Sequence, residues 1–277
     1  MLRRFFCQAG LPVAAGPALA GDARDAKDAA TLPAVTVSGE READADITVE
    51  TALLNGAIGY AKAAQPSAEL GTSVDLSADG RTMVVGAPYE DSLAEDSGAV
   101  HVFTRGATGW APQAVVHAPS PAFGDRFGEA LALTSDGLKL AVGAPGFASH
   151  RGAVFVFAFD NGQWMQDSLL EDPTDPTTDD GRQDFGWAVD LADDGNTLMA
   201  GWKYGGASAV VFARDGGPWA SQSIFMSATE FDESPFALSA DGNTLVLGRR
   251  DNRTTAGKGG VADVYQRSGG AWRYDTE

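Results

Sequence analysis

Two sequence markers recur through the chain at nearly the same interval. One is the Asp-Gly of the motif Leu-x-x-Asp-Gly, with spacings of 57, 58 and 47 residues between Asp79, Asp136, Asp194 and Asp241. The other is a tryptophan, with spacings of 54, 55 and 53 residues between Trp110, Trp164, Trp219 and Trp272. Self-similarity at a period of about fifty residues is typical of a fold built from adjacent copies of one supersecondary unit. The sequence therefore predicts four such units.

Each unit contains short apolar runs bounded by Gly, Asp and Pro. The runs richest in Val and Phe are GAVHVF (98–103), GAVFVF (152–157), SAVVFA (208–213) and GVADVY (260–265). Such runs predict strands, and no segment shows helical periodicity. Four strands in a unit of this period predict an all-β fold, a β-propeller of about four to five four-stranded blades. We place the repeats at residues 70–126, 127–184, 185–231 and 232–277.

The N-terminal part of the chain has a different composition. Residues 1–20 combine Arg3 and Arg4, a moderately apolar stretch and an Ala-Leu-Ala end, which predicts an export signal. Residues 21–50 are rich in Ala, Asp and Glu and predict an acidic, disordered linker before a propeller at 51–277. Cleavage after Ala20 would remove Cys7, the single cysteine, and with it disulfide and thiol chemistry. We therefore expect a periplasmic or extracellular protein.

The formal net charge of −18 excludes some classes of partner. So acidic a surface repels phosphate backbones, which disfavours nucleic acid. No segment approaches about 18 uninterrupted apolar residues, so we expect no membrane span.

Short motifs that recur in the repeats resemble those of a known family, the FG-GAP repeats of integrin-α-type propellers, in the variety found in bacteria. Phe127-Gly128 and Phe185-Gly186 stand where the Phe-Gly of that family belongs. Residues 86–88 and 143–145 match its Gly-Ala-Pro. The third and fourth repeats depart from it, with Gly-Trp-Lys at 201–203 and Gly-Arg-Arg at 248–250. The resemblance implies adhesion or protein recognition.

Integrin-like repeats also carry a calcium loop, so each Asp-Gly is either part of a metal site or a turn. Asp75 with Asp79, and Asp190 with Asp194, retain half of that pattern, but the closing carboxylate is missing from both. Ala132 and Ala237 replace the first aspartate in the other two repeats. Asp-Gly between two apolar runs is a strong hairpin signal. We therefore predict turns and no cofactor, with calcium as the alternative.

An acidic segment between the second and third repeats is the other place where a metal ion could bind. Its candidate ligands, beside Asp172, are Asp175, Asp179, Asp180 and Asp184. Two prolines and several threonines favour a solvated loop instead.

We find no catalytic motif: no Gly-x-Ser-x-Gly elbow, His-Glu-x-x-His pair or phosphate-binding loop. Trp187 and Trp202 break the one-per-unit tryptophan pattern, which makes them candidates for exposed, ligand-binding aromatics, with blade packing as the alternative. We predict a non-enzymatic binding or interaction module for a protein or glycan partner. The competing hypothesis is a glycan-binding or glycan-processing propeller.

Ring closure is the remaining question about the fold. The sequence ends early in a fourth strand of the last unit, and residues 53–70 align with the end of a blade. We expect a small closed ring, with a strand near Ile58–Ala64 in the closing sheet. An unclosed arc would expose strand edges and favour self-association.

Overall fold

The computed structural model describes residues 67–107, 109–174, 183–203, 207–226, 235–254 and 257–275. The segments assigned to the export signal, the acidic linker and the closing strand near Ile58–Ala64 lie outside these ranges. No helix within the described ranges is long and apolar enough to cross a membrane.

Sixteen strands of the described residues form four separate four-stranded sheets, here called blades 1 to 4. Blade 1 consists of β1 (Val74–Leu76), β2 (Thr82–Ala87), β3 (Ala99–Gly106) and β4 (Gly109–Val116). Blade 2 consists of β5 (Ala130–Leu133), β6 (Lys139–Ala144), β7 (Ala153–Asp160) and β8 (Gln163–Glu171), with the one-turn helix α2 (Phe147–His150) before β7. Blade 3 consists of β9 (Ala188–Leu191), β10 (Thr197–Gly201), β11 (Ala207–Ala213) and β12 (Ala220–Met226). Blade 4 consists of β13 (Phe236–Leu238), β14 (Thr244–Thr254), β15 (Gly257–Ser268) and β16 (Ala271–Tyr274).

Every blade is an antiparallel meander in which each strand pairs with its neighbours in sequence. The predicted all-β propeller architecture of four-stranded blades is confirmed, and each predicted repeat contains one blade. The fourth blade has a short outer strand: β16 has four residues, which pair with Tyr265 to Ser268 of β15, whereas the outer strand β8 of blade 2 has nine. The short fourth strand expected from the sequence is therefore confirmed.

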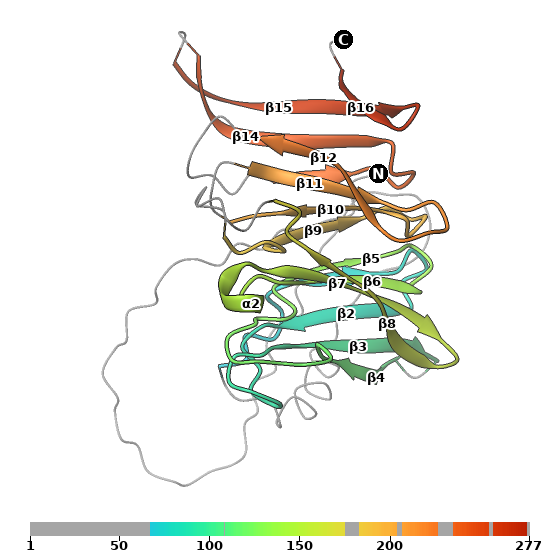
Figure 1. The fold of residues 1–277 in the computed structure, drawn as a ribbon. Helices are drawn as coiled ribbons and strands as arrows, with labels where there is room; N and C mark the ends of the chain where they lie inside the picture. Colours follow the sequence, from blue (N-terminus) through green and yellow to red (C-terminus); the bar gives the residue numbers. More distant parts are fainter. Residues whose placement is uncertain are drawn as a thin grey trace, which may run out of the picture.

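The blades lie in a row in sequence order, with blade 1 and blade 4 at opposite ends (Figure 1). The extensive contacts between described blades join sequence neighbours only. The described residues thus form an open row, and the small closed ring that the sequence favoured is not formed among them.

The Phe-Gly dipeptides join consecutive blades. Phe127 pairs in parallel with Gly98 of blade 1, and Phe185 pairs in the same way with Gly152 of blade 2. The Phe127 ring is fully buried and packs edge-on against Phe155 and Phe157, at centroid distances of 5.5 and 5.8 Å. Gly152 has a φ of 78°, and a Cβ there would collide with the backbone of Phe185. Glycine therefore permits this close approach of two blades.

Because the strands alternate in direction, each blade has two ends. The FG end carries the Phe-Gly and Gly-Ala-Pro segments, and α2 lies there (Figure 1). The DG end carries the Asp-Gly turns and the hairpin between the third and fourth strands.

Candidate functional site

A group of interacting charged and aromatic side chains among the described residues lies at the FG end of blades 1 to 3. We call it the charged cluster, and its members are Arg126, Glu129, His150, Asp184, Trp187 and Lys203. They come from the segments before β5 and β9, from α2 and from the end of β10. These segments connect strands of a rigid scaffold, which is where binding residues commonly lie.

Asp184 links two of the connecting segments. Its Oδ1 accepts a hydrogen bond from Nδ1 of His150 at 2.8 Å and one from Nη2 of Arg126 at 3.3 Å. The carboxylate is buried, with 8% of its side chain exposed, whereas the imidazole of His150 is 60% exposed. The buried acid therefore orients an imidazole whose other face is open to solvent.

The backbone around these residues is unusual. Ala148, Ser149 and His150 all have positive φ, as do Arg126 and Asp184. Such conformations are costly for residues other than glycine and persist where the surroundings impose them. Here the N–H of Asp184 donates to the carbonyl of His150, and the N–H of Arg126 donates to that of Asp96. The same contact recurs at two blade junctions, so the repeat itself fixes these side chains.

Trp187 is the aromatic centre of the cluster. Its side chain is half-buried, at the start of blade 3. The Nζ of Lys203 lies 3.4 Å from the centroid of the indole ring, and the Cζ of Arg126 lies 5.9 Å from it. Both distances are within the range of cation–π attraction. Two cations thus hold the ring in place.

Glu129 is the acid closest in sequence to the Phe-Gly of blade 2. Burial raises the pKa of its carboxyl, and the charges of Arg126 and Lys203 offset only part of that rise. Its Oε2 is buried, and no group of the described residues donates a hydrogen bond to it. A carboxyl in this environment is closer to exchanging a proton at neutral pH than an exposed one.

The two tryptophans that the sequence singled out, Trp187 and Trp202, differ in their exposure to solvent. Trp202 is 3% exposed, packs 5.0 Å from the ring of Phe185 and donates from Nε1 to Asp172 at 2.8 Å. It is a core residue, and the expectation of an exposed aromatic is not met there. Trp187 keeps a half-buried position suited to ligand contact.

The acidic segment is only partly described. Asp175, Asp179 and Asp180 lie outside the described residues. Asp172 accepts from Trp202, and Asp184 accepts from His150 and Arg126. Within the described ranges no group of three or more metal-ligating side chains comes together.

The Asp-Gly pairs form turns, as predicted. Their glycines have φ between 61 and 72°. The Oδ1 of each aspartate accepts from the backbone N–H two residues later, at 2.9 Å for Arg81 after Asp79. The Ser77 hydroxyl also donates to Asp79, at 2.6 Å, and lowers the pKa of that carboxyl. The carboxylate therefore stabilises its own loop.

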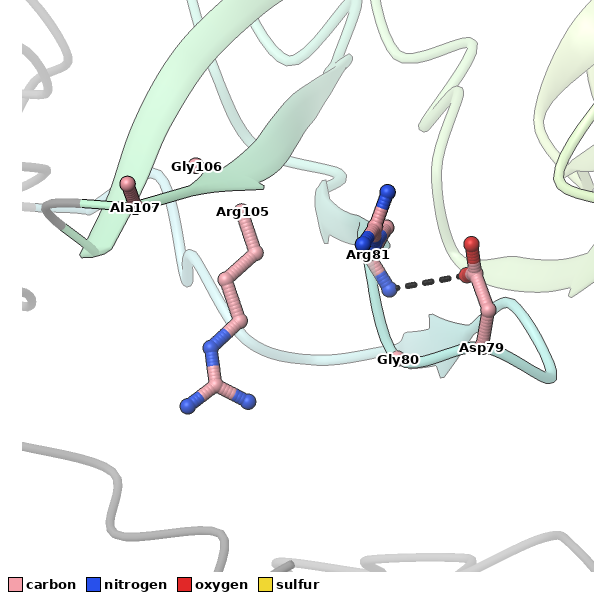
Figure 2. Close-up of a pocket in the computed structure, with 6 residues that line it drawn as sticks. All are labelled: Asp79, Gly80, Arg81, Arg105, Gly106 and Ala107. Carbon is pink, nitrogen blue, oxygen red and sulfur yellow. Dashed lines mark hydrogen bonds between the residues drawn. The ribbon is translucent and has the colours of Figure 1, made fainter.

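A shallow hollow of about 430 Å³ lies beside the first of these turns, at the DG end of blade 1. Figure 2 shows its lining residues, with Asp79 bonded to the Arg81 backbone and the Arg105 side chain extending into the open space. Both arginines are exposed. Two guanidinium groups make this hollow unsuitable for a cation.

The first aspartates of the partial metal pattern join blades. Oδ2 of Asp75 accepts from the N–H of Leu133 in blade 2, and Oδ2 of Asp190 accepts from Leu238 in blade 4, both at 2.7 Å. Ala132 and Ala237 stand at the equivalent positions of blades 2 and 4.

Sequence reasoning missed most of the charged cluster. Arg126 and Asp184 directly precede the Phe-Gly dipeptides, and Glu129 and Trp187 directly follow them. A comparison of these flanking positions between the repeats could have identified the residues of the charged cluster.

Four antiparallel four-stranded blades, with Phe-Gly segments at the first two junctions, define a propeller-type repeat protein. The FG-GAP repeat family matches residues 60–103, which include β1, β2 and the first part of β3 in blade 1. The chain is also 38% identical over 93 residues to integrin alpha-M of Mus musculus, an alignment that covers 31% of this chain and 8% of that protein. One segment of the chain is thus similar to the FG-GAP repeat family and to integrin alpha-M, and the chain spans a small part of that relative's length.

Two solved structures resemble the fold at low sequence identity. A Bacteroides fragilis protein named as a 6-phosphogluconolactonase has a TM-score of 0.50 at 17% identity, over 73% of this chain and 52% of that one. TolB of Acinetobacter baumannii has a TM-score of 0.41 at 14% identity, over 73% of this chain and 42% of that one. The first supports the fold alone.

Proposed function

We propose that this protein is a secreted or periplasmic binding module that recognises a partner protein through the charged cluster. The observation that carries the proposal is the half-buried Trp187 with Lys203 and Arg126 against its ring. Tryptophan and arginine are enriched among the interface residues whose truncation costs the most binding free energy. The likeness to integrin alpha-M supports the proposal by association.

The geometry favours binding over chemistry at this site. Asp184 and His150 are hydrogen-bonded, but Asp184 also accepts from Arg126, which stabilises the carboxylate. Exposed His150 and half-buried Trp187 and Lys203 offer a donor, an apolar surface and a cation to a partner. We therefore assign Asp184 and Arg126 to positioning the segments and Trp187 to contact.

The test compares two tryptophans in similar surroundings. Trp187 lies under Lys203, and Trp219 lies under Arg214 at 4.8 Å, away from the cluster at the start of the last strand of blade 3. Wild type, Trp187→Ala and Trp219→Ala are immobilised on beads and exposed to bacterial envelope and host-cell extracts, and retained proteins are quantified by mass spectrometry. We expect at least one protein to be retained by wild type and Trp219→Ala and lost with Trp187→Ala. Equal retention by all three variants would contradict the assignment of the site.

A glycan-binding or glycan-processing role is the second candidate, and Glu129 is the observation that favours it. A carboxyl whose pKa is raised by burial suits the general acid of glycoside hydrolysis, a reaction that also needs a second carboxylate. Release of reducing sugar from any of a panel of polysaccharides by wild type, with loss of that release in Glu129→Gln, would replace the first proposal. No release by wild type would leave binding as the function.

A further inference from the structure

Each pair of consecutive blades is joined by the same kind of apolar interface. We call the side of a blade turned toward the next blade in sequence its following face, and the opposite side its preceding face. On the following faces of blades 1 to 3, the two central strands carry small or slender apolar residues that are 0% exposed. These are Val84 and Val102 in blade 1, Ala141 and Val156 in blade 2, and Met199 and Val211 in blade 3. They pack against larger residues of the next blade.

The preceding faces supply those larger residues. In blade 2 the face includes Leu140, Val142 and Phe157, and in blade 3 it includes Leu198 and Phe212. In blade 4 it includes Leu245, Leu247 and Tyr265. One interface, with two different halves, therefore occurs three times within the described residues.

The two halves also occur at the ends of the row, where no described blade covers them. On the following face of blade 4, Val246 and Val264 are half-buried, and Ala237 and Ala262 are exposed. Their strand register matches that of the fully buried Ala141, Val156, Ala132 and Val154 in blade 2. The following face of blade 4 is thus half of an interface without its described counterpart.

The preceding face of blade 1 shows the same contrast. Val74 is 55% exposed, and Leu76, Met83 and Val85 are half-buried. The equivalent residues of blade 2 are almost fully buried, namely Leu131, Leu133, Leu140 and Val142. One chain therefore carries both complementary halves of the repeated interface at opposite ends of its described blades (Figure 1).

We propose that two copies of this chain associate head to tail, with the following face of blade 4 in one copy docked on the preceding face of blade 1 in the other. The contact continues the interface that already joins blades 1 to 2, 2 to 3 and 3 to 4. Because the two surfaces differ, the contact is heterologous, and a two-copy assembly closes by making it twice. The described blades match about half of a solved propeller chain, 52% of its length, so two rows are of the right extent for one ring.

The negative net charge of the chain opposes the contact between two copies. Each chain carries a formal charge of −18, so repulsion opposes association and salt screens it. Association driven by apolar faces should therefore strengthen when sodium chloride is raised from about 0.05 to about 0.5 M, where the screening length falls several-fold.

The experiment measures mass in solution by sedimentation velocity and light scattering at about 50 μM in 0.15 M salt. Wild type is compared with Ala262→Glu, on the following face of blade 4, and with Ala220→Glu, an equally exposed strand alanine on blade 3. We expect twice the chain mass for wild type and Ala220→Glu, and single-chain mass for Ala262→Glu with unchanged far-UV circular dichroism. A single-chain mass for wild type would overturn the proposal, and so would a dimeric Ala262→Glu.

A mixing experiment separates head-to-tail contact from contact between like faces. Val74→Glu disables the preceding face of blade 1 and should also give single chains. Ala262→Glu mixed with Val74→Glu should regain dimers, because each mixed pair still has one intact contact. If the mixture stays at single-chain mass while each interface is disabled separately, the contact is not heterologous and the proposal fails.

Discussion

Glu90 and His101 form a buried, hydrogen-bonded pair in blade 1. The Oε2 of Glu90 lies 2.7 Å from Nε2 of His101, and about 7 to 8% of each side chain is exposed. Blade 2 has Phe147 and Phe155 at the equivalent places, with ring centroids 5.5 Å apart. A buried charge is tolerated only with a partner, so the pair must be retained or replaced as a unit.

This pair makes the stability of blade 1 depend on pH. Burial favours a higher pKa for Glu90, but the hydrogen bond and charge of His101 outweigh it and bring the pKa below its ordinary value of 4.5. A lowered pKa in the folded state stabilises the fold above the unfolded pKa, and this contribution is lost as pH falls through the folded value. Thermal melts should show wild type more stable than Glu90→Gln at pH 7, with the difference shrinking below about pH 4.5. Exposed Glu95→Gln serves as the control, and a constant difference between pH 3 and 7 would contradict the linkage.

How far residues could be placed from the sequence depended on whether their contacts are local. The Asp-Gly turns were predictable because Asp79 bonds to Ser77 and Arg81, within two residues of itself. Arg126 and Asp184 are 58 residues apart in the sequence, and His150 and Asp184 are 34 apart, so no local sequence pattern predicts either contact. Trp202 broke the tryptophan spacing because it fills a core position where the first two repeats have alanine in Gly-Ala-Pro.

At the scale of strands, the blades are joined by carboxylates as well as by apolar packing. Asp75 reaches from β1 to the backbone of β5, and Asp190 reaches from β9 to β13. The junction between blades 2 and 3 has Ala132 in this place and relies instead on Phe185 and on the bond from the Ser135 N–H to Asp193. The sequence pattern that looked like half a metal site is thus a device for holding blades.

Removing one of these carboxylates should loosen one junction. Asp190→Ala leaves the partly buried N–H of Leu238 without its acceptor, which should cost about 1–3 kcal/mol of unfolding free energy. Urea denaturation followed by circular dichroism measures the loss, with exposed Asp215→Ala as the control. Equal midpoints for the two variants would show that the cross-blade bond contributes nothing.

At the scale of the whole molecule, the acidic charge raises the question of divalent cations. We expect folding without calcium, because the turn aspartates bond to their own loops and Asp75 and Asp190 bond to neighbouring blades. A chelator such as EDTA at about 1 mM should therefore leave the melting temperature unchanged, since stabilisation by a ligand requires binding to the folded state. A rise of several degrees on adding calcium would place a site in the acidic segment, and Asp184→Asn would then be the variant to test.

We propose above all that the FG end of blades 1 to 3 is the face that binds a partner. The direct measurement is hydrogen–deuterium exchange of the wild-type chain, alone and with the protein recovered by the bead capture. We predict slowed exchange confined to the segments around residues 123–129, 146–151 and 183–187, with no change at the Asp-Gly turns. Protection centred on Asp79, Arg81 and Arg105 in the hollow at the DG end (Figure 2) would contradict the account.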